Sequence, residues 1–354
     1  MTGSDSDLPI SIRLADDNDR ERWDAYVANN AAGDFFHRFG WREVIASAYG
    51  YGDVYLIAEC GEAIVGVLPL IDVRSPLLGR SLISTAFTIG GGPLFDDGNV
   101  RDALYQKAED IGRERSVRYV ELRCNGDMPA NWVGVGGRYA NFSMQLPQEE
   151  DQNLSVIPRR RRAEVRKAVK SKADGVLNVC HGLKPDRFYN LYASALRDHG
   201  TPVFPHRFLN ALVDKFEADM DMTFIETDDG PIVGLLSFKY KNKYMPYYIG
   251  ATRDARRFRG AELVFWSAMR RAVELDYATY DFGRSKVDTG PFQFKKLWGI
   301  EPEMLTYQYN LIGVNEAPNI NPNNPKFRMF ADAWRRLPLP LANQLGPLLA
   351  PNFA

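Results

Sequence analysis

VYLIAECGEAIVGVLPLI, residues 54–71, and MTFIETDDGPIVGLLSFKY, residues 222–240, are two versions of one pattern. Each is an apolar run, a short turn with acidic residues and glycine, and a second apolar run that contains Ile-Val-Gly. Two apolar runs around a short glycine-containing turn predict a β-hairpin. The shared Ile-Val-Gly places Gly66 and Gly234 at the same point of the second strand, where glycine usually marks a bulge or a close approach by other atoms.

The order of elements after each hairpin is repeated as well. A helix is expected over Val100 to Arg115 and a strand over Val117 to Cys124, and then again over Glu262 to Glu274 and Tyr277 to Arg284. Such pieces are common in α/β proteins, but matching order together with Ile-Val-Gly favours a duplication. Antiparallel strands followed by a helix and a strand are the element order of the GNAT (acyl-CoA N-acyltransferase-like) fold. We therefore expect an α/β (α+β) chain of two tandem GNAT domains, each a mixed, mostly antiparallel sheet flanked by helices.

Composition is that of an ordinary globular protein, with 25% charged and 45% hydrophobic residues and a net charge of -1. The single cysteines Cys60, Cys124 and Cys180 argue against a disulfide framework or a zinc cluster and fit a reducing compartment. The polar N-terminus is unlike a secretory signal. The longest apolar stretch, Ile64 to Ile71, is far shorter than the roughly 20 residues that span a bilayer. The sequence predicts a cytoplasmic protein without a bound metal.

The length of 354 residues suggests two domains. We place the first GNAT-like domain at 1–150 and the second at 151–315, with a basic linker helix over 157–175. Residues 316–354 form a proline-rich tail that is expected to pack on the domains.

Two interpretations of this tail stay open. Repeated prolines prevent one long helix, and packing across the domains is the simpler outcome. The alternative is shallow, peripheral attachment to the inner membrane, with Trp334, Arg335 and Arg336 at the lipid headgroups.

A degraded phosphate-loop motif opens the second predicted helix. In RRFRGAEL, Arg257 and Gly260 match the first two fixed positions of the GNAT pattern [Q/R]-x-x-G-x-[G/A], but Glu262 replaces the small residue. Glycine lets backbone N–H groups approach an anion that the helix dipole favours, whereas a carboxylate there repels a pyrophosphate. An ordinary basic helix cap is the alternative interpretation.

The linker helix is strongly basic. IPRRRRAEVRKAVKSKADG contains Arg160, Arg162 and Arg166 among eight cations, against one acid in the helical run, Glu164. In a chain of near-zero net charge this predicts a local anion-binding surface, although a merely solvated helix face would look the same. Candidate partners are the phosphates of tRNA, a nucleotide-linked or lipid-linked sugar precursor, or an anionic membrane surface.

Six segments in this order resemble those of the FemAB/FemX-type aminoacyltransferases, and more closely the FemAB-like proteins associated with exosortase/PEP-CTERM systems. They are FFHRFGWREVI (35–45), IVGVLPL (64–70), RDHGTPVFP (197–205), YDFGRSK (280–286), FQFKKLWG (292–299) and NPNNPKF (321–327).

The resemblance implies transfer of an acyl or aminoacyl group to an amine of a cell-envelope precursor, in the manner of the peptidoglycan cross-bridge enzymes, whose donor is aminoacyl-tRNA. The family's late Phe-Lys pair is similar to Phe294-Lys295. The chain lacks the long coiled-coil insertion that some relatives carry as a tRNA-binding arm. The donor therefore stays open between aminoacyl-tRNA and acyl-CoA, with no permanently bound cofactor.

Candidate catalytic groups gather in YDFGRSKVDTGPFQFKKLWG, where the basic residues after Asp281, Lys295 among them, are expected on a glycine-containing loop. The sequence has no motif for a covalent or metal-dependent route, so direct transfer in a ternary complex is expected. Asp281, at a strand end, could orient the amine or act as base, or form a structural salt bridge with Arg284. Lys295 could stabilise the developing oxyanion or hold a phosphate. Arg284, Lys286 and Lys296 are candidates for binding carboxylates or phosphates.

A second candidate cluster is RDHGTPVFP. Arg197 and Asp198 could bind substrate, and His199, placed on a predicted loop, could accept the ammonium proton. Tyr247 and Tyr248, in a predicted strand, resemble the position where GNAT proteins bind the donor arm, although core packing would also explain them.

Three functions follow from these features. The leading one is an acyl or aminoacyl transferase acting on an envelope or exopolysaccharide precursor. The second is a CoA-dependent N-acyltransferase for a small amine or amino sugar. The third is a non-enzymatic scaffold that binds anionic glycans through the basic segment.

Overall fold

The computed structural model describes four stretches of the chain: residues 9–75, 79–147, 154–318 and 325–350. These described residues divide into two compact units, the first within 9–138 and 305–318 and the second within 139–304 and 325–350. This division differs from the sequence-based boundaries at residues 150 and 315. The chain leaves the first unit within β7 (Val133–Asn141) and returns within β15 (Glu303–Leu311), because β15 pairs with β6 and completes the sheet of the first unit.

The sheet of the first unit has the order β1-β2-β3-β4-β6-β15-β7, with β5 beside β3. Only the neighbours β4 and β6 among the registered pairs are parallel. Its strands are β1 Ile10–Leu14, β2 Gly52–Cys60, β3 Ala63–Ser75, β4 Gly79–Ser84, β5 Leu94–Phe95, β6 Tyr119–Leu122, β7 Val133–Asn141 and β15 Glu303–Leu311. Its α-helices are α1 Arg20–Asn29, α2 Gly40–Tyr49 and α3 Gly98–Glu114.

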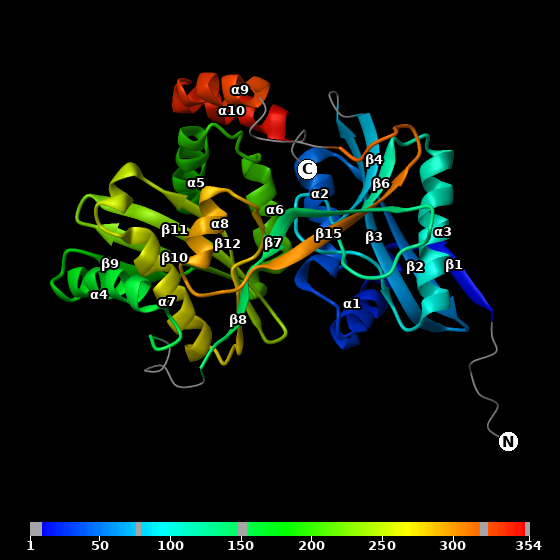
Figure 1. Ribbon diagram of the computed structural model, residues 1–354, viewed down its shortest axis with the longest axis horizontal. Helices are drawn as coiled ribbons and strands as arrows, with labels where there is room; N and C mark the ends of the chain where they lie inside the picture. Colours follow the sequence, from blue (N-terminus) through cyan, green and yellow to red (C-terminus); the bar gives the residue numbers. More distant parts are fainter. Residues whose placement is uncertain (1–8, 76–78, 148–153, 319–324, 351–354) are drawn as a thin grey trace. The chain divides into compact units, whose positions relative to one another are not determined.

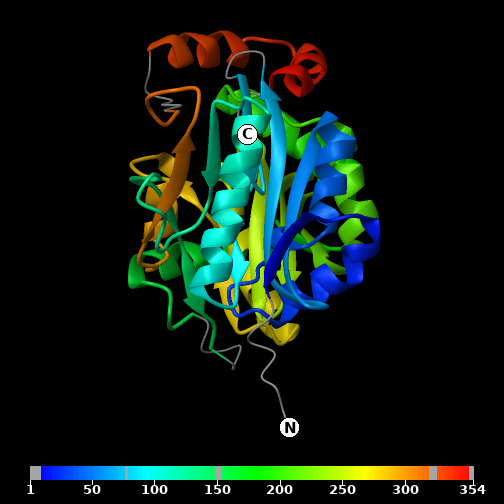
Figure 2. The same ribbon diagram turned by 90° about the vertical axis from the view of Figure 1, so that its right-hand side faces the viewer.

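Helix α3 packs along the strands of the first sheet (Figures 1 and 2). Its buried face carries Leu104, Ala108 and Ile111, at the helical spacing that the sequence predicted. The helix begins at Asp97, whose carboxylate accepts hydrogen bonds from the backbone N–H groups of Asn99 and Val100. A side-chain cap of this kind satisfies the first amides of a helix.

The sheet of the second unit has the order β8-β13-β12-β11-β10-β9. Strands β9 to β12 are antiparallel neighbours, and β12 and β13 are parallel. The strands are β8 Ser143–Gln145, β9 Asn178–His181, β10 Met220–Thr227, β11 Gly230–Tyr240, β12 Lys243–Ala251 and β13 Thr279–Asp281, with a short β14 Ser285–Lys286 paired to the end of β7. The α-helices are α4 Arg159–Ala173, α5 Pro185–His199, α6 His206–Phe216, α7 Gly260–Glu274, α8 Gly290–Lys296, α9 Pro325–Arg335 and α10 Leu339–Leu349.

Helices cover both faces of the second sheet. Leu263 and Val264 of α7 share a core with Val233 and Leu235 of β11. On the other face, Gly250 of β12 lies so close to the backbone of α5 that a Cβ would stand 2.4 Å from the Tyr192 nitrogen. This sandwich positions the end of β12 and the start of α7 on a rigid base.

The duplicated hairpins are confirmed, because β2–β3 and β10–β11 both form around short turns. The residue-by-residue alignment of Ile-Val-Gly is wrong by one position. A Cβ on Gly66 would meet Val100 of α3 at 2.5 Å, whereas Gly234 faces Leu191 of α5, a helix that precedes its hairpin. The glycine-bearing strand carries one extra residue in each hairpin, Val65 directly before Gly66 but Ile232 two positions before Gly234. A one-residue difference turns every side chain to the opposite face.

The tail forms two helices, α9 and α10, separated at Pro338, and both contact α5. The proline that begins α10 ends the preceding helical path, as the sequence predicted. The first part of the family-like segment NPNNPKF lies outside the described residues. No helix in the described part of the chain is both long and apolar enough to cross a membrane.

Candidate active site

Strands β12 and β13 pair over a very short distance. Their parallel register consists of Lys243↔Thr279 and Tyr244↔Tyr280, after which β12 continues to Ala251 while β13 ends at Asp281. The irregular register with β11 leaves one extra residue, Tyr247, on β12. A bulge of this kind bends a strand and re-aims its neighbours. The two strands therefore part beside Tyr247 and Tyr248, the residues that resemble the donor-arm position of GNAT proteins.

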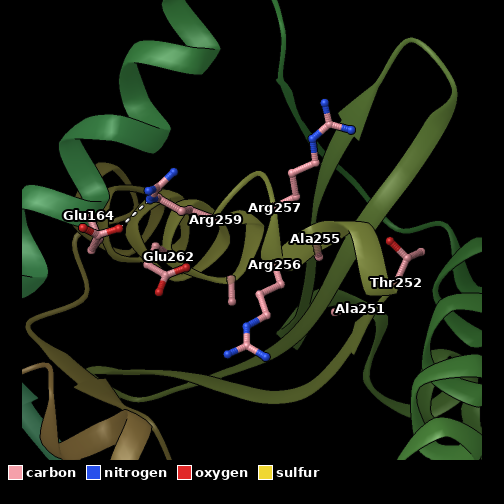
Figure 3. A pocket seen from close by; sticks show the side chains of 9 residues that line it. Glu164, Ala251, Thr252, Ala255, Arg256, Arg257, Arg259 and Glu262 are labelled. Carbon is pink, nitrogen blue, oxygen red and sulfur yellow. Dashed lines mark hydrogen bonds and ion pairs between the residues drawn. The ribbon is translucent and has the colours of Figure 1, made fainter.

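A cavity of about 420 Å³ lies where β12 leads into α7 (Figure 3). Arg256, Arg257 and Arg259 line it, and the side chains of Arg256 and Arg257 point in different directions from the loop. Within the described part of the chain, neither of these two exposed arginines has an ion-pair partner. The cavity thus offers unneutralised positive charge at a helix N-terminus, a combination that favours phosphate.

The start of α7 differs from the start of α3 in one chemical respect. Its N-cap residue, Arg259, makes no side-chain hydrogen bond to the first turn, whereas Asp97 already satisfies the first amides of α3. The first backbone amides of α7 can therefore bind an anion, whereas in the first unit the carboxylate of Asp97 already binds the corresponding amides of α3. Gly260 lies against β11, where a Cβ would approach Val233 at 2.7 Å, so close packing accounts for this glycine.

The predicted repulsion from Glu262 does not arise, because this carboxylate forms an ion pair with Arg161 of α4. The Arg161 side chain is 8% exposed and also lies over the ring of Phe294, at 4.9 Å. The basic side chains of α4 therefore do not all face solvent. One of its arginines points inward and neutralises the residue that departs from the GNAT pattern.

A second ion pair joins the same helices. Glu164 of α4 accepts from Lys167 at 2.8 Å and from Arg259 at 2.5 Å. These two hydrogen bonds, that from Lys167 foremost, lower the pKa of Glu164 to about 2. The dashed line in Figure 3 marks the Arg259 contact. The ionised carboxylate of Glu164 is thus paired with Arg259, one of the three arginines that line the cavity.

Lys295 lies on α8 rather than on the loop that the sequence suggested. Its ammonium Nζ donates to the carbonyl oxygens of Gly283 at 2.8 Å and Arg284 at 3.0 Å. Burial disfavours the charged form and lowers the pKa of Lys295 to about 7, with the charge of Asp281 opposing the shift. A lysine that titrates near neutral pH is typical of functional sites.

Asp281 ends β13, as predicted, and is buried. Its carboxylate accepts from the Gly283 N–H at 2.7 Å and from the Asn141 amide at 3.3 Å. The Arg284 guanidinium lies 4.4 Å above the ring of Tyr139. Asn141 and Tyr139 were missed from the sequence because they come from β7, far from Asp281 in the chain and without a motif of their own.

The remaining basic candidates fall on separate elements. Lys286 belongs to β14 and Lys296 is exposed at the end of α8. On α4, Arg160 and Arg166 are exposed and Arg162 is half-buried. The helix runs from Arg159 to Ala173, close to the expected range of 157–175.

The second predicted cluster is helical, contrary to expectation. Arg197, Asp198 and His199 are the last residues of α5, which ends at Gly200 in the left-handed region, with φ of 78°. Asp198 pairs with Arg253 at 2.9 Å, just before the arginine-lined cavity. His199 is exposed, and its carbonyl accepts from Arg335 of α9. This arrangement ties the histidine backbone to the tail helices.

Tyr247 and Tyr248 are half-buried on β12. The ring centroid of Tyr248 lies 5.3 Å from that of Phe204 and 5.5 Å from that of Tyr192. The ring centroids of Tyr247 and Tyr248 are 4.8 Å apart. Both therefore form part of an aromatic cluster beside the point where β12 bends.

Residues 159–296 match the family model described as an acetyltransferase (GNAT) domain. These residues are a GNAT domain. The chain is thus an acyltransferase, which disfavours a purely non-enzymatic scaffold. No curated protein matches the chain at a significant level.

Solved structures extend the likeness to both units. FemX superposes with a TM-score of 0.66 at 14% identity, covering 86% of this chain and 98% of its own. A tandem GNAT protein from the clavulanic acid biosynthesis pathway gives 0.56 at 10%, covering 87% and 100%. The C-terminal domain of an Agrobacterium fabrum protein named as a lysylphosphatidylglycerol synthetase gives 0.53 at 13%, covering 83% and 92%. The chain has a tandem GNAT fold.

Proposed function

We propose that the protein transfers an acyl or aminoacyl group from a phosphate-bearing donor to an amine of a cell-envelope or exopolysaccharide precursor. One observation carries the proposal: β12 and β13 part beside the arginine-lined cavity at the start of α7. A donor arm can pair with the edge of β12 while its phosphates meet the α7 amides. The narrower link to exosortase/PEP-CTERM systems stays a prediction from the sequence segments.

The chemistry is direct transfer. The lone pair of the neutral acceptor amine attacks the donor carbonyl, a C–N bond forms, and the carbonyl oxygen takes the electron pair. Collapse breaks the bond to the donor's sulfur or ribose oxygen, and that atom takes up a proton in place of the one that the amine loses. The protein's contribution is to position the two reactants and to stabilise the oxyanion.

The ammonium group of Lys295 has a hydrogen-bond donor to spare for the oxyanion. A charged ammonium has three N–H donors, and two of them are used by the carbonyls of Gly283 and Arg284. The third can donate to the oxyanion. Asp281, held by Gly283 and Asn141, can orient the acceptor amine.

Transfer of a radiolabelled group tests the proposal. The purified protein is incubated with an envelope-precursor extract and either labelled acetyl-CoA or labelled aminoacyl-tRNA, and amide product is counted. Lys295→Ala and Asp281→Ala should each abolish product without a change in the far-UV circular dichroism spectrum. Lys215→Ala, on α6, is the control and should match the wild type. Product formation by both active-site variants at the wild-type rate contradicts the proposed site.

A CoA-dependent N-acyltransferase for a small amine is the second candidate. It is favoured by the acetyltransferase domain match over 159–296 and by an arginine-lined cavity suited to a pyrophosphate. Isothermal titration with acetyl-CoA beside charged and uncharged tRNA separates the two. Binding of acetyl-CoA alone favours this candidate, and binding of charged tRNA alone favours aminoacyl transfer.

Peripheral contact with the inner membrane, the alternative left open for the tail, is proposed through α10 rather than through Trp334, which is buried. Leu341, Leu345 and Leu348 of α10 are 41%, 37% and 71% exposed and lie on one helix face. Exchange of all three for serine should reduce flotation with anionic liposomes. Equal flotation of variant and wild type would remove the idea.

A further inference from the structure

We propose that a second cavity, between the start of α4 and the end of α8, binds a phosphorylated nucleoside that forms part of the donor. The cavity has a volume of about 420 Å³. It is lined by Pro158, Arg160, Arg161, Glu164, Lys296 and Leu297. This inference rests on the proposed transferase function and adds a subsite that neither the GNAT pattern nor the family resemblance assigns.

The charges around this cavity favour phosphate. Arg160 and Lys296 are exposed, and neither has an ion-pair partner in the described part of the chain. The only lining carboxylate, Glu164, is already engaged by Lys167 and Arg259. The first turn of α4 contains no acidic residue, so its dipole adds to the attraction for an anion. The two unpaired cations are the groups that can bind phosphate.

The lining of the cavity is also partly apolar, because Leu297 and Pro158 belong to it. Leu297, next to Lys296 in the chain, is 47% exposed, and Pro158 is exposed as well. A nucleobase or ribose presents a flat, partly apolar surface that such residues can cover. Cations beside apolar residues match a nucleotide better than a free phosphate or a polysaccharide.

The two segments that line the cavity, the start of α4 and the end of α8, are held together by close packing. Gly299 follows α8 with φ of 80°, and a Cβ there would meet the Pro158 ring at 2.7 Å. The residue after α8 is thus fixed against the residue before α4. A subsite with a preset shape loses less entropy on binding than a loose surface does.

The subsite is connected to the donor-phosphate cavity through Glu164, which lines both. Lys296, which lines the subsite, is the neighbour of Lys295. A donor that meets the α7 arginines with one phosphate can therefore reach Arg160 and Lys296 with a further nucleotide. Two donors carry this chemistry: coenzyme A with its 3′-phosphoadenosine, and the acceptor end of a tRNA.

Calorimetric binding to the full chain tests the subsite. The double variant Arg160→Ala/Lys296→Ala should bind coenzyme A, or an RNA oligonucleotide ending in CCA, at least about tenfold more weakly than the wild type, because charge-assisted contacts to phosphate are lost. Lys170→Ala/Lys172→Ala removes the same charge from the other end of α4 and should bind within about twofold of the wild type. Equal losses in the two double variants would overturn the subsite, because they would show only a general charge effect.

Two further arms separate the donor sources and the possible failures. Dephospho-coenzyme A lacks the 3′-phosphate; if coenzyme A is the donor, the Arg160/Lys296 effect should vanish with it, and if RNA is the donor, the effect should appear with the oligonucleotide. Leu297→Ala should weaken nucleotide binding without affecting inorganic pyrophosphate. Wild-type binding of neither probe would overturn the proposed donor and the subsite together. Tight wild-type binding that the Arg160/Lys296 variant retains would overturn the subsite alone.

Discussion

Arg161 of α4 is ion-paired with Glu262 in the first turn of α7, and both side chains are largely buried, at 8% and 18% exposed. From the sequence, Glu262 is an obstacle to a phosphate site. In the fold it is a neutralised anchor for the basic helix. The degraded motif and the arginine that compensates for it are about a hundred residues apart, so neither can be interpreted alone.

The two single variants of this pair should differ in their effect on pyrophosphate binding. Arg161→Ala leaves a carboxylate unpaired at the start of α7, which should cost on the order of 3 kcal/mol of unfolding free energy and also weaken pyrophosphate binding. Glu262→Ala restores the small residue of the GNAT pattern. Urea denaturation and calorimetry measure both effects, and the double variant completes a cycle whose coupling energy should be well above zero. Additive losses in the double variant would show that the pair has no coupling energy.

Glu164→Gln should strengthen anion binding. The wild-type carboxylate competes with phosphate for Arg259, so its neutralisation should raise pyrophosphate affinity several-fold at low salt, with a smaller gain at high salt. Asp174→Asn, at the other end of the helix, changes the net charge equally and serves as the control. If both variants bind pyrophosphate equally, the Arg259 contact does not compete with the ligand.

The pH dependence of transfer should report Lys295. Its pKa is lowered to about 7, so the ammonium that can donate to the oxyanion is present below this pH and is lost above it. The rate constant for transfer should therefore fall as pH rises through about 7, while deprotonation of the acceptor amine opposes the fall. Lys295→Arg keeps a charge at all accessible pH values and should lose this descending limb.

The opposite limb would assign a different role to the same residue. A neutral Lys295 has a lone pair, and as a general base it would make the rate rise with pH through about 7. Loss of an ascending limb in Lys295→Arg would contradict oxyanion stabilisation, and an unchanged profile would remove Lys295 from the chemistry.

Local sequence patterns predicted much of this fold. Both hairpins, the helices α3, α4 and α7, and the position of Asp281 at a strand end follow from apolar periodicity and from turn residues. His199 was misplaced on a loop because Gly200, which ends α5, was interpreted together with the following proline as one turn. Lys295 was assigned to a loop for a similar reason, since Gly290 and Pro291 begin the short helix α8.

Partners supplied by distant elements could not be predicted in this way. Asn141, Arg161 and Glu164 reach the candidate site from β7 and α4, and no spacing rule connects them to Asp281, Glu262 or Arg259. The pKa of Lys295 likewise depends on burial, which local sequence patterns do not predict. The parts of the site that the sequence missed are those that arise only when remote segments meet.

The two Ile-Val-Gly glycines provide a stability test of the duplicated fold. Gly66→Ala would place a methyl group 2.5 Å from the Val100 side chain, which is branched and stiff, and should cost about 1–3 kcal/mol. Gly234→Ala meets Leu191 and Phe224 at 3.1 Å and 3.2 Å, contacts that a small shift of either side chain can relieve, and should cost less. Urea denaturation followed by circular dichroism measures both, and Gly52→Ala, with open space around its Cβ, is the control. Equal costs for Gly66→Ala and Gly234→Ala would mean that the motif sets the same packing in both units, contrary to the one-residue offset between them.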